Sequence, residues 1–183
     1  MNDINTKCLE IFPRWLESLG EDVRTLQTAR AGEVTRAARQ TLTGGINYTF
    51  KSLDLVPDGI DDIGYLDDAF VIRMASRKAC MQGIDALPEE IKAKLGRMSE
   101  DTGVVKELFG DELFVRFEKY TDALADGSAR GRTVEEILDN PEISSEFANE
   151  VTEFIQTYSS PGFTQDEKNI IKLKAFMEAR LPK

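Results

Sequence analysis

Six aspartates within one short segment are the residues of this chain best placed to do chemistry. They lie in the sequence LDLVPDGIDDIGYLDDAF, which runs from residue 53 to residue 70. Carboxylates gathered in this way repel one another, and hard cations such as Mg²⁺, Mn²⁺ or Ca²⁺ relieve the repulsion. The candidate metal ligands are Asp54, Asp58, Asp67 and Asp68. In that interpretation Arg73 or Arg77 would hold a phosphate group of the substrate.

The same aspartates also have structural roles that need no metal. Asp58 precedes a glycine, a pair typical of turns, and Asp67 and Asp68 suit the first turn of a helix, where negative charge meets the positive end of the dipole. Leu, Val, Ile and Tyr alternate with the acids, so the segment should lie against a core, where carboxylates need partners. We favour this interpretation, with a structural motif made of Asp54, Pro57, Asp58, Gly64, Tyr65, Asp67 and Asp68.

Two known metal-binding patterns fit the segment poorly. An EF-hand loop starting at Asp58 would have Ile60 at its third position and Ile63 where glycine is required. The spacing from Asp61 to Asp67 is similar to the DDxxxxD motif of all-α prenyl synthases, which bind diphosphate through Mg²⁺. Gly64 interrupts the helix that this motif needs, and the chain has no second motif of the kind.

Part of the chain resembles a known family. The residues KSLDLVPD at 51–58 and GYLDD at 64–68 resemble the signature of the YkvA-like family, a domain of unknown function (1232), whose members carry a segment close to SPIDLIPDFIPVLGYLDD. The resemblance covers about residues 41–79 and departs from the family at Ser52, Gly59 and Asp61. It implies a helical hairpin around an aspartate-bearing turn, and it implies no activity.

The chain contains no histidine, which excludes several kinds of active site. Ser–His–Asp and Cys–His nucleophiles are impossible, as are zinc sites that use histidine. The usual general base near neutral pH is also missing. We therefore name no catalytic residue and expect a protein that is not an enzyme.

The charge of the chain is strongly negative. Its 33 Asp and Glu outnumber its 23 Lys and Arg, and the net charge is −10. A chain this acidic repels the phosphate backbone, so we expect no nucleic-acid partner. A protein with a basic surface, or a divalent cation, is the natural counterpart.

The chain should be a cytoplasmic protein. Its first residues, MNDINTKCLE, lack the basic start and apolar stretch of a secretory signal. No stretch approaches the roughly 20 apolar residues of a membrane span. No helix combines a dense basic face with a wide apolar one, so we do not expect peripheral membrane binding. Cys8 and Cys80 make no disulfide framework.

Helical spacing of apolar residues recurs along the chain, and no segment alternates as a strand would. We expect an all-α protein, an irregular bundle of roughly six to eight helices. Expected helices include 6–19, ended by Gly20, then 21–42, and one from Gly64 to about Gln82 whose first half is apolar nearly all round. Thr133 with Glu136, and Thr164 with Glu167, have the spacing of capping boxes.

The domain organisation follows the charge. Residues 1–98 should form a helical core with the aspartate hairpin, and residues 99–183 an acidic helical part packed on it as one globular unit. The function we expect is that of a non-enzymatic regulatory or protein-interaction module. The alternative is an Mg²⁺- or Mn²⁺-dependent enzyme that acts on a phosphorylated small molecule through the aspartate cluster.

Overall fold

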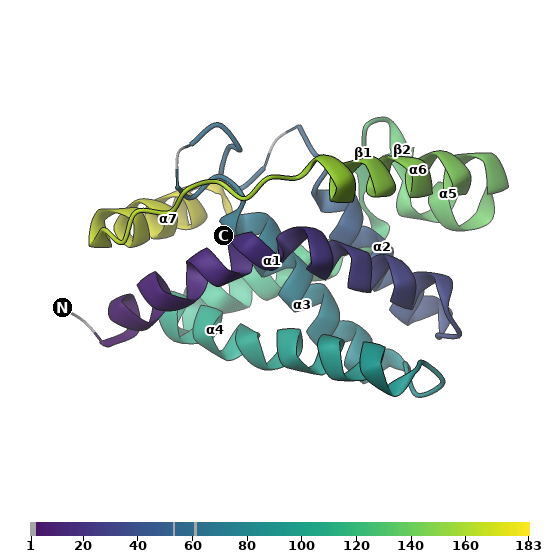
Figure 1. Cartoon of the computed structure of the whole chain (residues 1–183), viewed down its shortest axis with the longest axis horizontal. Helices are drawn as coiled ribbons and strands as arrows, with labels where there is room; N and C mark the ends of the chain where they lie inside the picture. Colours follow the sequence, from purple (N-terminus) through teal and green to yellow (C-terminus); the bar gives the residue numbers. More distant parts are fainter. Residues whose placement is uncertain (1–2, 53, 61) are drawn as a thin grey trace.

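The computed structural model describes residues 3–52, 54–60 and 62–183, and it is an all-α helical bundle (Figure 1). The helices are α1 (Asp3–Ala31), α2 (Arg36–Tyr48), α3 (Leu66–Gln82), α4 (Glu89–Ala123), α5 (Val134–Asp139), α6 (Pro141–Thr157) and α7 (Glu167–Arg180). A short 3₁₀ helix, η1 (Leu124–Asp126), follows α4, and two-residue strands β1 (Ser128–Ala129) and β2 (Arg132–Thr133) form a small antiparallel hairpin. No helix in the described part of the chain is both long enough and apolar enough to cross a bilayer.

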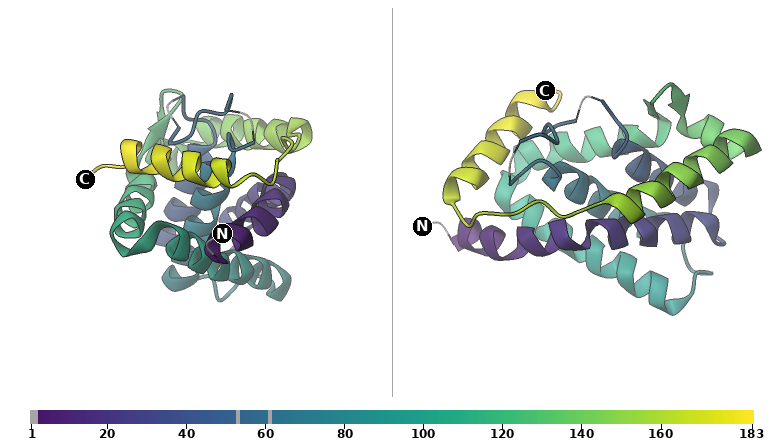
Figure 2. Two further views of the ribbon diagram at one scale, coloured as in Figure 1. Left: turned by 90° about the vertical axis from the view of Figure 1, so that its left-hand side faces the viewer. Right: turned by 45° about the horizontal axis from the view of Figure 1, so that its top comes forward.

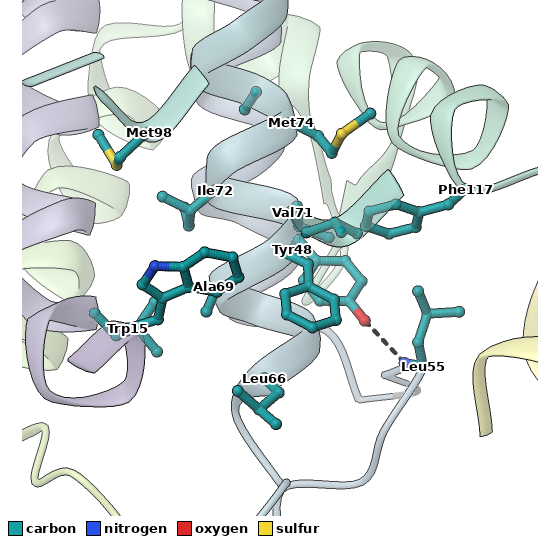
Figure 3. Packing of buried hydrophobic residues seen from close by; sticks show 14 of the residues in the cluster. Trp15, Tyr48, Leu55, Leu66, Ala69, Val71, Ile72, Met74, Met98 and Phe117 are labelled. Carbon is teal, nitrogen blue, oxygen red and sulfur yellow. Dashed lines mark hydrogen bonds between the residues drawn. The ribbon is translucent and has the colours of Figure 1, made fainter. Parts of the chain in front are cut away.

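Helix α3 lies in the middle of the bundle, between α1, α2 and α4 (Figure 1). Every residue from Leu66 to Ser76 is buried, as expected for a helix that is apolar nearly all round in its first half and has neighbours on all sides. An aromatic cluster forms the centre of the core, where Phe70 packs against Phe12 at 5.3 Å and Phe109 at 5.8 Å between ring centres. Figure 3 shows Trp15, Ala69 and Ile72 packed along the same helix.

Helix α1 continues through Pro13 and through Gly20, the residue at which the sequence predicts a helix end. Pro13 lacks an N–H, so it cannot donate to the carbonyl of Leu9, and Gln165 donates to that oxygen instead at 3.4 Å. Gly20 does not end the helix either. The ring of Tyr158 packs beside Gly20, and its hydroxyl donates to the carbonyl of Leu16 at 2.6 Å. The expected division into helices 6–19 and 21–42 is therefore wrong. Gly20 keeps its own N–H and does not interrupt the helix, and Gln165 supplies a donor for the carbonyl that Pro13 leaves without its helical partner.

The C-terminal helices α5, α6 and α7 pack on the outside of the bundle, against α1, α2 and α4. The chain leaves α6, runs beside α1 and enters α7, which lies near the start of α1 (Figure 2). The expected boundary at residue 98 falls inside α4, which continues to Ala123 with a break at Gly110, where φ is 74°. One hydrophobic core includes residues from both sides of that boundary.

One of the two expected capping boxes is confirmed. Thr133 and Glu136 form the capping box at the start of α5, with both reciprocal hydrogen bonds present. The start of α7 is different, because Asp166 rather than Thr164 caps it by accepting the N–H of Lys168 at 2.9 Å.

Two adjacent glycines in α2 bring neighbouring elements close, and this arrangement can be tested. A Cβ at Gly44 would overlap the backbone carbonyl of Leu124, so Gly44→Ala should lower the free energy of unfolding by about 1–3 kcal/mol. Gly96 in α4 is the control, because a Cβ there meets nothing within 4 Å. Gly96→Ala should raise stability by about 0.5–1 kcal/mol through helix propensity. Urea unfolding of both variants measures the difference, and equal effects would contradict the close approach.

Candidate functional site

Asp67 holds the aspartate segment against the bundle. Its side chain, in the first turn of α3, has no solvent exposure. One oxygen, Oδ2, accepts the hydroxyl of Tyr48 at 2.5 Å and the N–H of Val56 at 3.0 Å. The Tyr48 hydroxyl in turn accepts the N–H of Leu55 at 2.8 Å, the dashed line in Figure 3. Asp67 and Tyr48 together therefore fasten residues 55 and 56 to α2 and α3.

Three buried carboxylate oxygens nearby have no hydrogen-bond partner among the described residues. They are Oδ1 of Asp54, Oδ1 of Asp67 and Oδ2 of Asp68. Asp68 is only 2% exposed. An ionised carboxylate in such a place is strongly unfavourable unless something neutralises it. The cluster therefore favours protonated carboxyl groups.

The pKa values of the cluster are shifted in the same direction. Burial, and to a smaller extent the neighbouring carboxylate of Asp58, raises the pKa of Asp54 to about 7. Burial raises the pKa of Asp67 to about 7, against the hydrogen bonds from Tyr48 and Val56 that favour its charged form. Burial and then Asp67 raise the pKa of Asp68 well above its usual range. The pKa of Asp58 is also raised by burial.

Positive charge near the cluster is scarce. Lys51 and Arg180 favour the charged form of Asp54 and lower its pKa only in part. Lys51 lies over the rings of Tyr48 and Tyr120, with its Nζ 5.9 and 5.4 Å from the ring centres. Arg180 donates to the backbone carbonyl of Asp54 at 3.3 Å rather than to the side chain. In the described ranges none of the four candidate ligands forms a salt bridge with a cation.

The four candidate metal ligands interact with one another without forming a metal-binding set. Across residues 3–52, 54–60 and 62–183, no group of three or more carboxylates or thiols lies so that it could hold one ion. Asp61, which begins the DDxxxxD spacing, lies outside the described residues. The metal-dependent alternative stays a prediction, and the described geometry adds no support to it.

Arg73 and Arg77 are engaged away from the aspartate cluster. Arg73 is buried, lies 4.1 Å from the ring centre of Trp15, and pairs with Asp22 at 3.3 Å and Asp101 at 3.0 Å. Arg77 pairs with Glu118 at 2.9 Å. Both arginines thus join helices, and neither points to a shared phosphate site with Asp54, Asp58, Asp67 and Asp68.

The remaining motif residues shape the turn before α3. The N–H of Ile60 donates to the carbonyl of Pro57 at 2.9 Å, which closes a tight turn around Asp58. Gly64 packs onto the backbone of Asp58, where a Cβ would overlap the carbonyl oxygen. The ring of Tyr65 packs edge-on against Tyr158 of the segment after α6, at 5.4 Å. These contacts agree with a structural role for the motif.

A second site, which the sequence analysis missed, lies beside this turn. A groove of about 300 Å³ is bounded by the aspartate segment, the β1–β2 turn and α6, and it is lined by Thr49, Phe50, Asp58, Tyr65, Arg130, Glu150, Glu153, Phe154 and Thr157. We call it the aromatic–acidic groove. The signal that could have pointed to it is the run from Thr133 to Glu167, which contains no Lys or Arg.

Comparison of the chain with protein-family models, with curated proteins and with solved structures finds no match. The interpretation of both sites therefore depends on their own geometry.

The buried carboxylates predict an unusual pH dependence. An aspartate whose pKa is raised in the folded state binds its proton more tightly there than in the unfolded chain, where the pKa is about 3.9. Stability is therefore highest when the group is protonated in both states and falls as pH rises from about 4 to about 7. We expect the free energy of unfolding to be lower at pH 8 than at pH 5.5 by about 1–4 kcal/mol. Urea titrations at the two pH values measure it, and greater stability at pH 8 would contradict protonated carboxyl groups in the cluster.

Asp67 and Asp68 should respond differently to substitution. Asp68→Asn keeps the shape and removes the ionisable group, so it should raise stability at pH 8 and flatten the pH dependence. Asp67→Ala leaves the Tyr48 hydroxyl and the Val56 N–H without their acceptor, which should cost about 1–3 kcal/mol at either pH. Thermal melts at pH 5.5 and pH 8 separate the two variants. A loss of stability at pH 8 in Asp68→Asn would show that Asp68 is charged and stabilising.

Proposed function

We propose that this chain is a non-enzymatic protein-interaction module that binds a partner protein with a basic surface. The observation that carries the proposal is the charge of residues 133–167, which include nine acidic residues and no Lys or Arg. The acids are Glu135, Glu136, Asp139, Glu142, Glu146, Glu150, Glu153, Asp166 and Glu167.

Four of these acids line one side of α6. Glu142, Glu146, Glu150 and Glu153 follow one another at intervals of four, four and three residues, which places them on one face of a helix. We call this row the α6 acidic stripe. Phe147 and Val151 are buried on the opposite side of the helix. The core therefore fixes the rotation of α6 and leaves the stripe toward solvent.

Most of the stripe is free to interact. Within the described residues, Glu142, Glu146 and Glu153 have no ion-pair partner, whereas Glu150 pairs with Arg132 at 2.7 Å and with Arg130 at 3.3 Å. Like charges one turn apart on a helix destabilise it slightly. A basic partner would relieve that repulsion and would be steered toward the stripe by its field.

The other features of the chain support the same proposal. Cys8 is buried, and burial raises the pKa of its thiol to about 12, which makes it unreactive and suits a reduced cytoplasmic protein. The resemblance of residues 41–79 to the YkvA-like family is part of the proposal and adds no enzymatic activity to it. We place the protein in the cytoplasm and expect neither nucleic acid nor a membrane as its partner.

A charge-matched pair of variants tests the proposal. The wild-type chain should retain partner proteins from lysate at about 0.05 M salt. We expect Glu142→Gln/Glu146→Gln/Glu153→Gln to retain about one fifth of that amount or less. The control, Glu10→Gln/Glu17→Gln/Glu112→Gln, makes the same change in net charge at exposed acids on α1 and α4. This variant should retain the same proteins as the wild-type chain. Quantitative mass spectrometry of the retained proteins measures the ratio. Equal losses in both variants, or none in the first, would contradict a partner bound at the stripe.

A further inference from the structure

The aromatic–acidic groove combines two kinds of wall. Phe50, Tyr65 and Phe154 supply aromatic surface, and Asp58, Glu150 and Glu153 supply carboxylates. Phe50 is buried and packs edge-on against Phe154 at 6.3 Å, so its ring is held in place. Aromatic faces beside carboxylates attract cations and repel anions.

A guanidinium of this chain already lies in the groove. The Cζ of Arg130 is 5.1 Å from the ring centre of Phe50, and its Nη1 donates to Glu150 Oε2 at 3.3 Å. The Arg130 side chain is 57% exposed, so this contact contributes little to stability and is open to exchange. The walls are thus compatible with a planar cation stacked on Phe50 and bonded to a glutamate.

A neighbouring arginine shows the same arrangement in a buried form. Arg132 lies 5.8 Å from the ring centre of Phe50 and 5.1 Å from that of Phe147. It donates to both oxygens of Glu150, at 2.9 and 2.7 Å. Arg132 keeps Glu150 fixed at the edge of the groove, whereas Glu153 and Asp58 have no cationic partner in the part of the chain that the structure describes.

We propose that the aromatic–acidic groove receives an arginine side chain of the basic partner protein. This rests on the proposed function and specifies where that partner docks. The guanidinium stacks on the aromatic wall and donates to Glu153 and Asp58, in the place that Arg130 now occupies in part. Arginine suits the site better than lysine because it is planar and offers two parallel donors to a carboxylate.

A synthetic peptide tests the proposal directly. The probe is a fluorescein-labelled peptide with three arginines in a Gly–Ser background, and its control carries citrulline, which has the same shape without the charge. We expect fluorescence anisotropy to show binding of the arginine peptide only. Asp58→Asn/Glu153→Gln should weaken binding about tenfold, whereas Glu10→Gln/Glu17→Gln, with the same charge change at exposed acids of α1, should stay within about twofold. Equal effects of the two double variants, or equal binding of the citrulline peptide, would overturn the groove as the site.

Arg130 provides a second and independent test. Its φ of 50° is left-handed, which asparagine tolerates, so Arg130→Asn removes the internal competitor without straining the turn. We expect this variant to bind the arginine peptide about threefold more tightly or better. Weaker or unchanged binding would overturn the proposal, because Arg130 would then be part of the site or outside it.

The two proposals fail separately. If the lysate proteins depend on the α6 acidic stripe but the peptide ignores the groove variants, the groove inference is wrong and the interaction module remains. If the peptide binds as expected but lysate retention ignores the stripe, the groove binds arginine and the proposed function of the stripe is wrong.

Discussion

The hydrogen bonds of Asp67 with Tyr48 and Val56 join three parts of the chain at a point with no access to solvent. Tyr48 ends α2, Val56 lies in the connecting segment, and Asp67 lies in the first turn of α3. Because a buried polar group without a partner is costly, these groups constrain one another to a single arrangement. This constraint fastens the backbone of Leu55 and Val56 between the end of α2 and the first turn of α3.

The segment from Thr49 to Tyr65 connects the core to the groove. Phe50, Asp58 and Tyr65 come from it, and they form the wall that faces Glu150, Glu153 and Phe154 of α6. The Tyr65 ring packs on Tyr158, and Asp62 accepts the side-chain N–H of Asn169 in α7 at 2.9 Å. The aspartate segment is therefore held from the core side by Asp67 and from the outside by the C-terminal helices.

Two groups of acidic residues in this protein lie in environments with opposite consequences. Asp67 and Asp68 are buried in the first turn of α3, where desolvation raises their pKa and favours the neutral form. Glu142, Glu146 and Glu153 stand in solvent on α6. Of these two groups, only the second contributes to the field that a partner meets. The formal net charge of −10 counts every aspartate as ionised, including the buried ones that favour the neutral form. It also does not show that several of the exposed acids lie together on α6.

The all-α class, the apolar first half of α3 and the capping box at Thr133 could be predicted from the sequence, because helical periodicity and capping depend on residues a few positions apart. The sequence also indicated that the aspartates lie against a core. The continuation of α1 through Pro13 depends on tertiary contacts, since Gln165, far away in sequence, donates to the carbonyl of Leu9 that Pro13 leaves without its helical partner. Only the tertiary structure decided which aspartates are buried and which line a groove, because desolvation and charge pairing depend on neighbours brought together by folding. Those neighbours, Tyr48 for Asp67 and Glu150 with Phe154 for Asp58, are separated from their partners by between 19 and 96 positions of chain, beyond the reach of any local pattern.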